Sequence, residues 1–156
     1  MKTAGDIISD KPWGLISVSM DTLVYDVMQQ MIAKKIGAIL VGKEGAIVGI
    51  WTERDYFRNS IEPGFDAKKA VVGNYMNTEL ISVPPETPIT ALQDMFLGLF
   101  IRHILVKKEN DYIGLLSMGD VMRAILLEKD EKIKRLNKMA SWEYYENWGW
   151  HRKYDK

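Results

Sequence analysis

Cysteine is absent from the sequence, which excludes disulfide bonds, thiol nucleophiles and cysteine-ligated metal sites. Apolar runs are short, and none approaches the roughly 18 residues needed to cross a bilayer. Residues 1–13 are mixed and polar, so no signal peptide is predicted. The formal net charge is zero, which disfavours nucleic acid as a partner. These absences predict a cytoplasmic protein that does not bind a membrane.

Histidine is scarce, and the known catalytic motifs are missing. His103 and His151 are the only histidines, and neither lies in a Glu-x-x-His or His-x-x-x-His context, so no metal site is predicted. No P-loop and no recognisable Ser–His–Asp order occurs. We therefore expect no enzyme, and we interpret His103 as a strand residue that faces a polar cleft.

The sequence does contain an internal repeat. Residues 15–18 (Leu-Ile-Ser-Val) recur as residues 80–83, and the same offset places Ile39-Leu40-Val41 on Ile104-Leu105-Val106, Asp55 on Asp120 and Arg58 on Arg123. A repeat is interpreted before any local motif because it determines the architecture. Two copies of about 60 residues are each too small to bury a core alone. We expect a pseudo-twofold pair, with a ligand in the crevice between the copies.

Each copy predicts strand, helix, strand, strand and helix, which makes the fold α/β. The expected elements of the first copy are residues 15–18, 24–32, 38–41, 46–51 and about 53–60, and those of the second copy are 80–83, 89–99, 103–106, 112–116 and about 118–128. Thr22 and Thr87 are predicted to cap the first helix of each copy. Gly37 is predicted to end the first of these helices, whereas Arg102 at the equivalent position predicts a different stop.

The repeat divides the chain into three parts. Residues 1–66 form the first repeat with a linker, residues 67–128 the second repeat, and residues 129–156 a C-terminal helix with an aromatic tail. Residues 5–8 and 73–76 form a lead-in to each copy, and their different offset implies three extra residues around residues 10–13. The tail carries an apolar stripe and then clustered aromatic residues, namely Leu126, Ile133, Leu136, Ala140, Trp142, Tyr144, Tyr145, Trp148, Trp150 and Tyr154. We expect this tail to pack on the module or on a dimer partner.

The strongest local motif lies where each hairpin enters its second helix. Residues 49–55 and 114–120 both read glycine, two apolar residues, a hydroxyl, two variable residues and aspartate. One interpretation is a capping box, in which Ser or Thr and an acid three positions later bind the free N–H groups of the helix. The other is a nucleotide site, because a helix N-terminus suits phosphate and the aspartate can accept hydrogen bonds from ribose. The two interpretations do not exclude each other.

On these residues the chain resembles the paired CBS domains, also called Bateman modules, over roughly residues 5–128. The matching segments are residues 49–55, 114–120 and 101–106 (Ile-Arg-His-Ile-Leu-Val). The resemblance implies that Thr52, Asp55, Ser117 and Asp120 contact phosphate and ribose. It implies that the lead into the first strand of each copy contacts the base, through Gly14, Leu15 and Ile16 in one copy and Glu79, Leu80 and Ile81 in the other.

The two copies differ in their basic residues, so we predict unequal sites. The second copy has Arg102 and His103 where basic residues of the family reach phosphate, and the first copy has Gly37 and Ala38 there. Arg54, next to Asp55, is the candidate that compensates in the first copy.

The resemblance also implies a function. Such modules sense AMP, ADP or ATP in the cleft between the repeats, with S-adenosylmethionine or NAD as further adenosine-containing candidates, and they regulate a partner without catalysis. A homodimer is expected on the same ground. The alternative is a structural or interaction protein with vestigial clefts that acts through its aromatic tail. Adenine nucleotides should raise the melting temperature only in the first case.

Overall fold

The computed structural model describes residues 1–129. The predicted tail therefore lies outside the described residues from residue 130 onward, and this includes Ile133 and the whole aromatic cluster. Among the described residues, no helix has both the length and the apolar character needed to cross a membrane.

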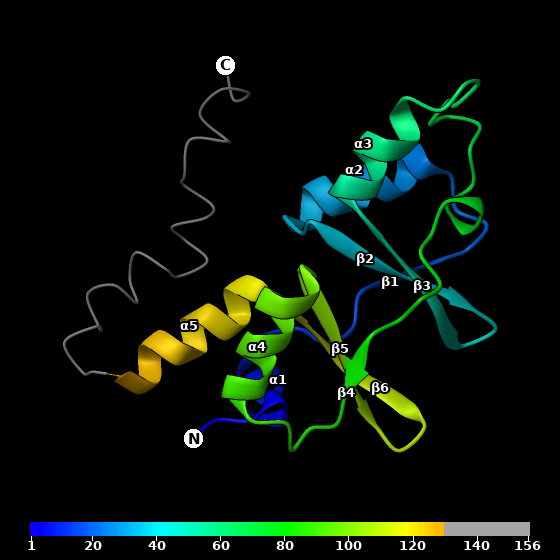
Figure 1. The fold of residues 1–156 in the computed structure, drawn as a ribbon. Coiled ribbons are helices and arrows are strands. Elements are labelled where there is room, and N and C mark those ends of the chain that lie inside the picture. Colours follow the sequence, from blue (N-terminus) through cyan, green and yellow to red (C-terminus); the bar gives the residue numbers. More distant parts are fainter. Residues whose placement is uncertain (130–156) are drawn as a thin grey trace.

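Two equivalent units make up the described chain (Figure 1). After helix α1 (Ala4–Asp10), the first unit contains β1 (Ser17–Ser19), α2 (Val24–Lys34), β2 (Ala38–Lys43), β3 (Ala46–Thr52) and α3 (Glu53–Ser60). A short 3-10 helix, η1 (Val72–Asn74), precedes the second unit, which contains β4 (Ser82–Val83), α4 (Ile89–Leu99), β5 (His103–Lys108), β6 (Asp111–Ser117) and α5 (Met118–Lys129). The predicted α/β order is confirmed in both copies.

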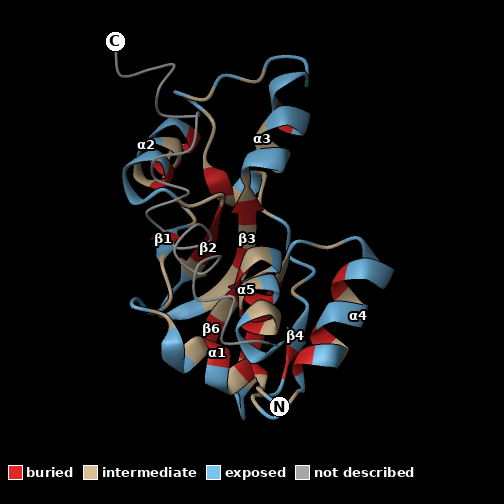
Figure 2. Ribbon diagram, turned by 90° about the vertical axis from the view of Figure 1, so that its left-hand side faces the viewer, coloured by how far each residue is buried: buried red, intermediate tan, exposed pale blue. Residues whose placement is uncertain are grey.

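The two sheets repeat each other in topology and in register. In each, the first strand pairs in parallel with the second, which pairs antiparallel with the third. Ser17 lies opposite Leu40 in the first sheet, and Ser82 lies opposite Leu105 in the second. The central strands each contain a buried apolar run, residues 38–41 in β2 (Figure 2) and residues 104–106 in β5. This continuous pattern is typical of strands that are covered on both faces.

The ends of the first helix in each unit correct three predictions. Leu23 caps α2 and Pro88 caps α4, so neither helix begins directly after Thr22 or Thr87. Both helices end on a left-handed residue, Lys35 with φ 56° and Phe100 with φ 53°, so the expectation that Gly37 ends one helix and that the other stops differently is wrong. A left-handed backbone conformation is unfavourable for a residue other than glycine. The packing around Lys35 and Phe100 must therefore stabilise it.

Gly37 has another role at this turn. A Cβ atom at this position would lie 2.9 Å from Oε1 of Glu53, and the backbone carbonyl of Gly37 accepts a hydrogen bond from the Glu53 N–H. The glycine therefore allows a close approach to the start of α3.

The lead-in segments are exchanged between the two units. Ala4 and Ile7 of α1 belong to the core of the second unit, together with Leu92, Ile104 and other residues of α4, β5 and α5. Val72 belongs to the core of the first unit, and Phe65, Tyr75 and Met76 pack against it. Helix α1 contacts β6 and α5, which come more than 100 residues later in the sequence, and Figure 1 draws it with the second unit. The division predicted between residues 66 and 67 stays a prediction, and the packing crosses it in both directions.

This exchange positions the candidate site. The chain leaves α1 on the second unit and enters β1 of the first unit, so residues 11–16 pass from one unit to the other. Any cavity beside this crossing has walls from both units.

Candidate functional site

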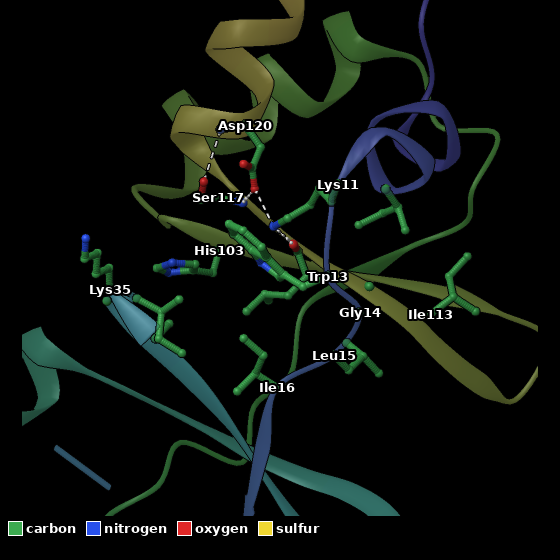
Figure 3. Close-up of a pocket in the computed structure, with 16 residues that line it drawn as sticks. Lys11, Trp13, Gly14, Leu15, Ile16, Lys35, His103, Ile113, Ser117 and Asp120 are labelled. Atoms are coloured by element: carbon green, nitrogen blue, oxygen red, sulfur yellow. Dashed lines mark hydrogen bonds and ion pairs between the residues drawn. The ribbon is translucent and has the colours of Figure 1, made fainter. Parts of the chain in front are cut away.

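A cavity of about 170 Å3 lies where the chain crosses between the units (Figure 3). Its walls come from the crossing segment, from the end of α2 with the start of β2, and from β5, β6 and the start of α5. The lining residues are Ile8, Lys11, Trp13, Gly14, Leu15, Ile16, Lys35, Ile36, Gly37, Ala38, His103, Ile113, Gly114, Leu115, Ser117 and Asp120. The predicted crevice between the repeats is therefore present.

Asp120 and Ser117 cap helix α5 at one end of this cavity. The Ser117 N–H donates to Oδ2 of Asp120 at 2.8 Å, and the Asp120 N–H donates to Oγ of Ser117 at 3.1 Å. Thr52 and Asp55 form the same reciprocal pair at α3, with distances of 2.9 and 3.2 Å. The capping-box interpretation is thus confirmed in both copies. It leaves the other carboxylate oxygen of each aspartate available for a different partner.

Lys11 reaches across the cavity to Asp120. Its Nζ donates to Oδ2 of Asp120 and to the carbonyl oxygen of Leu115, both at 2.9 Å, as the dashed lines in Figure 3 show. The Lys11 side chain is 17% exposed and the Asp120 side chain only 2%. An ion pair this far from solvent is screened little by water. It joins the crossing segment directly to the helix cap.

The second carboxylate oxygen of Asp120 is buried and accepts no hydrogen bond from the described residues. Nη1 of Arg123, one turn further along α5, lies 3.8 Å from this Oδ1 atom. A buried acceptor without a donor is uncommon and calls for an explanation, such as a water or a ligand. Oδ1 of Asp120 is therefore a candidate acceptor for a ligand hydroxyl.

His103 lies beside this pair and is neutral at physiological pH. Burial lowers the pKa of His103 from 6.5 to about 4, and the positive charges of Lys11 and Arg102 act in the same direction, while Asp120 opposes them. A neutral imidazole can donate one hydrogen bond and accept another, but it adds no charge. The cationic side chains that line the cavity are those of Lys11 and Lys35.

The structure brings together some of the predicted site residues and not others. Leu15, Ile16, His103, Ser117 and Asp120 all line the cavity, together with Gly14. Seven predicted residues do not line it, namely Thr52, Arg54, Asp55, Glu79, Leu80, Ile81 and Arg102. Most of these residues, among them Thr52 and Asp55, correspond in the sequence repeat to residues that line the Asp120 cavity. Their part in a second cleft stays a prediction.

Arg102 and Arg54 are both exposed side chains. The backbone carbonyl of Arg102 accepts the Met118 N–H at 2.9 Å and so helps to begin α5, but the Arg102 side chain is not part of the cavity wall. Their contacts with phosphate stay a prediction.

Sequence reasoning missed Lys11, Trp13 and Lys35 as lining residues. Lys11 and Trp13 lie in the stretch where the two lead-ins differ by three residues, and that difference was the available signal. Lys35 had no comparable signal, because a lysine in the last turn of a helix is common and needs no ligand.

Two sheet-and-helix units with a cavity between them define a paired α/β module. The sequence matches the family model "CBS domain" twice, over residues 4–62 and 72–127. The chain belongs to the CBS-domain family, and its two units are two CBS repeats.

Individual relatives agree with this assignment. The chain is 39% identical over 142 residues to the CBS domain-containing protein CBSX3, mitochondrial, of Arabidopsis thaliana, covering 88% of this chain and 68% of that protein. Among solved structures, a putative signal-transduction protein with CBS domains from Burkholderia ambifaria is similar with a TM-score of 0.77 and 29% identity, over 83% of this chain and 97% of that one.

A third relative was solved with a nucleotide. The CBS domain protein PAE2072 from Pyrobaculum aerophilum, complexed with AMP, is similar with a TM-score of 0.68 and 21% identity, over 81% of this chain and 96% of that one. At this identity the likeness shows the fold. The name of the plant relative places that protein in mitochondria, and the cytoplasmic location of this chain stays a prediction.

Proposed function

We propose that this chain is a regulatory module that senses an adenosine-containing nucleotide, AMP, ADP or ATP, in the cavity between its CBS repeats. The observation that carries the proposal is the buried carboxylate of Asp120, whose Oδ1 lacks a hydrogen bond and which lies in a cavity with apolar and cationic walls. A ribose diol supplies hydroxyl donors for such a carboxylate.

The apolar part of the cavity suits an adenine base. Ile8, Ile16 and Ile113 lie on its walls, and Trp13 adds an aromatic surface. The crossing segment at Gly14–Ile16 offers backbone groups beside these side chains, where the CBS resemblance expects the base. Apolar walls with a few placed polar groups are typical of small-molecule sites.

The cationic part suits phosphate. Lys11 and Lys35 outnumber the single carboxylate of Asp120 among the charged lining residues. Helix α5 directs its N-terminal end toward the same place, and its partial positive charge favours an anion. Ser117 keeps its hydroxyl hydrogen for a phosphate oxygen, since its Oγ acts as acceptor in the cap.

The relative solved with AMP supports the ligand class at the level of the shared fold. Around Asp55 we propose a second, unequal cleft. We also propose a homodimer and a regulated partner protein, and we assign no catalytic role. Exposed apolar side chains on the helices of both units are compatible with a helix-mediated dimer, including Ile32, Phe57, Leu97 and Phe100.

A ligand screen tests the proposal. AMP, ADP or ATP should raise the melting temperature of the full chain in a concentration-dependent way, and S-adenosylmethionine and NAD serve as the competing adenosine ligands. Asp120→Ala should weaken nucleotide binding by about 1.5–3 kcal/mol, because a hydrogen bond to a charged group is lost. Calorimetry measures this loss, with Asp120→Asn as the variant that keeps the side-chain shape.

Two outcomes would contradict the proposal. No adenosine ligand shifts the melting temperature, or the affinity is unchanged both in Asp120→Ala and in Asp55→Ala. The first result would favour the alternative, an interaction protein with vestigial clefts, and the second would show that the nucleotide binds outside the assigned clefts.

A further inference from the structure

Lys11 occupies one of the two carboxylate oxygens that a ribose diol can use at Asp120, while Oδ1 is the oxygen without a hydrogen bond. Its ammonium takes Oδ2 of Asp120 and the Leu115 carbonyl, both at 2.9 Å. The cavity beside it, at about 170 Å3, is smaller than the roughly 300–1,000 Å3 of common ligand pockets. Oδ2 already accepts from Lys11 and from the Ser117 N–H, so a ribose diol that donates to both oxygens of Asp120 must displace or rearrange the Lys11 side chain.

The free-energy cost of replacing the Lys11 ammonium at Asp120 differs between ligands with and without phosphate. A ribose diol replaces the ammonium as donor to Asp120, so the carboxylate keeps its hydrogen bonds. Lys11 loses its counter-ion at the same moment, and a buried ammonium without an anion is strongly disfavoured. A phosphate provides that anion in the same cavity, whereas an uncharged nucleoside does not.

The other copy has no such pair at its cap. Oδ1 of Asp55 accepts from Nη1 of Arg58 at 3.5 Å, and the Arg58 side chain is 68% exposed while that of Asp55 is 18% exposed. An exposed arginine leaves its partner at little cost, because water replaces the contact. Among residues 1–129, a ligand at Asp55 therefore meets no buried cation that would lose its counter-ion.

The difference originates in the lead-in segments. Ile8 packs on Gly114, and Met76 packs at the same place on Gly49, so these two residues are structurally equivalent. Seven positions separate Ile8 from Leu15, but only four separate Met76 from Leu80. The longer crossing segment contains Lys11 and carries it to Asp120, and the shorter one has Asn77, Thr78 and Glu79 in its place.

We propose that Lys11 is the specificity-determining residue of the Asp120 cavity: it holds Asp120 until a ligand offers both a hydroxyl donor for Asp120 and a phosphate for the Lys11 ammonium. This inference rests on the proposed function and narrows its ligand class to phosphorylated nucleosides. It assigns the selection for phosphate to the Asp120 cavity and not to the proposed cleft around Asp55.

Calorimetric titration of AMP and of adenosine tests the inference directly. The full chain carrying Asp55→Asn serves as the parent, so that the heat reports on the Asp120 cavity. In Lys11→Met the preference for AMP over adenosine should fall by about tenfold or more, the size of one charge-assisted hydrogen bond. Adenosine should bind at least as well as in the parent, because its competitor for Asp120 is gone.

Two further variants separate charge from folding. Lys11→Gln keeps a hydrogen-bond donor for the cap and should lose the preference for AMP in the same way. Lys43→Met removes an exposed lysine at the end of β2 and should leave the preference unchanged. An unchanged preference in both Lys11 variants would overturn the inference, while AMP binding by the parent would leave the proposed function intact. A parent that binds neither ligand would overturn both.

Discussion

At the scale of the residue, Asp120 and His103 line the same cavity but have different partners. Asp120 accepts from the Ser117 N–H and from the Lys11 ammonium, and the Arg123 guanidinium lies 3.8 Å from its other oxygen. His103 receives no comparable support, since the cations Lys11 and Arg102 lower its pKa together with burial and only Asp120 opposes them. The cavity therefore holds the Lys11–Asp120 ion pair beside a neutral imidazole.

The neutral state of His103 predicts a pH dependence of stability. Its pKa of about 4 in the fold lies below the ordinary 6.5, so between these values the unfolded chain binds more protons than the folded chain. The stabilisation is complete above pH 6.5 and is lost as the pH falls toward 4. The slope from one such group is at most about 1.4 kcal/mol per pH unit.

Urea unfolding at a series of pH values measures this effect. The free energy of unfolding should fall more steeply for the wild type than for His103→Gln, which keeps hydrogen-bonding capacity but does not titrate. The carboxylates are common to both proteins, so the difference between the curves isolates His103. Parallel curves through this window would show that His103 titrates normally in the fold.

At the scale of elements, two glycines let the lead-in segments approach the hairpins. A Cβ atom on Gly114 would lie within 2.8 Å of three atoms of the Ile8 side chain, and one on Gly49 would lie within 2.8 Å of two atoms of the Met76 side chain. Gly114 is buried beneath α1, whose packing in turn positions the crossing segment and Lys11. The spacing of lead-in and hairpin is thus part of the geometry of the cavity.

Gly114→Ala should lower the free energy of unfolding by about 1–3 kcal/mol, the usual cost of overpacking a core. Gly49→Ala should cost less, because the unbranched Met76 can change rotamer more easily than the β-branched Ile8. Urea unfolding of the two variants gives the comparison. Ile8→Ala in the Gly114→Ala background should recover part of the loss relative to additivity. Equal costs at the two glycines, with strictly additive double variants, would contradict this account.

The order of the elements could be predicted from sequence because it depends on local apolar patterns that occur twice. The capping boxes at Thr52 and Ser117 followed from spacing alone, and the structure contains both. The ends of α2 and α4 did not follow, because the left-handed residues Lys35 and Phe100 carry no local signature. The ion pair between Lys11 and Asp120 could not be predicted either, because it joins positions far apart in the sequence.

At the scale of the whole molecule, the exchange of lead-ins makes the two repeats dependent on each other. The repeated sequence predicted two units with a crevice between them, and both are present. It assigned each lead-in to the repeat that follows it, because adjacency in sequence is the only guide at that stage. The packing assigns α1 to the second repeat and residues 65–76 to the first. Tertiary burial of Ala4, Ile7 and Val72 decides this, and no local pattern encodes it.

Because the lead-in before each repeat packs in the core of the other repeat, a mutation in a lead-in should destabilise that other repeat more. Ile7→Ala, near the N-terminus, should cost about 2–5 kcal/mol and should accelerate hydrogen exchange in β5 and β6 more than in β2 and β3. Val72→Ala, which lies between the repeats in sequence, should do the reverse, since Val72 belongs to the core of β2 and β3. Exchange measured amide by amide in both variants makes the comparison. Each variant is the control for the other, because both remove buried apolar atoms from a lead-in. If each mutation instead loosened the repeat that follows it in the sequence, the exchanged packing would be refuted. The cavity could then no longer be attributed to a segment that passes from one core to the other.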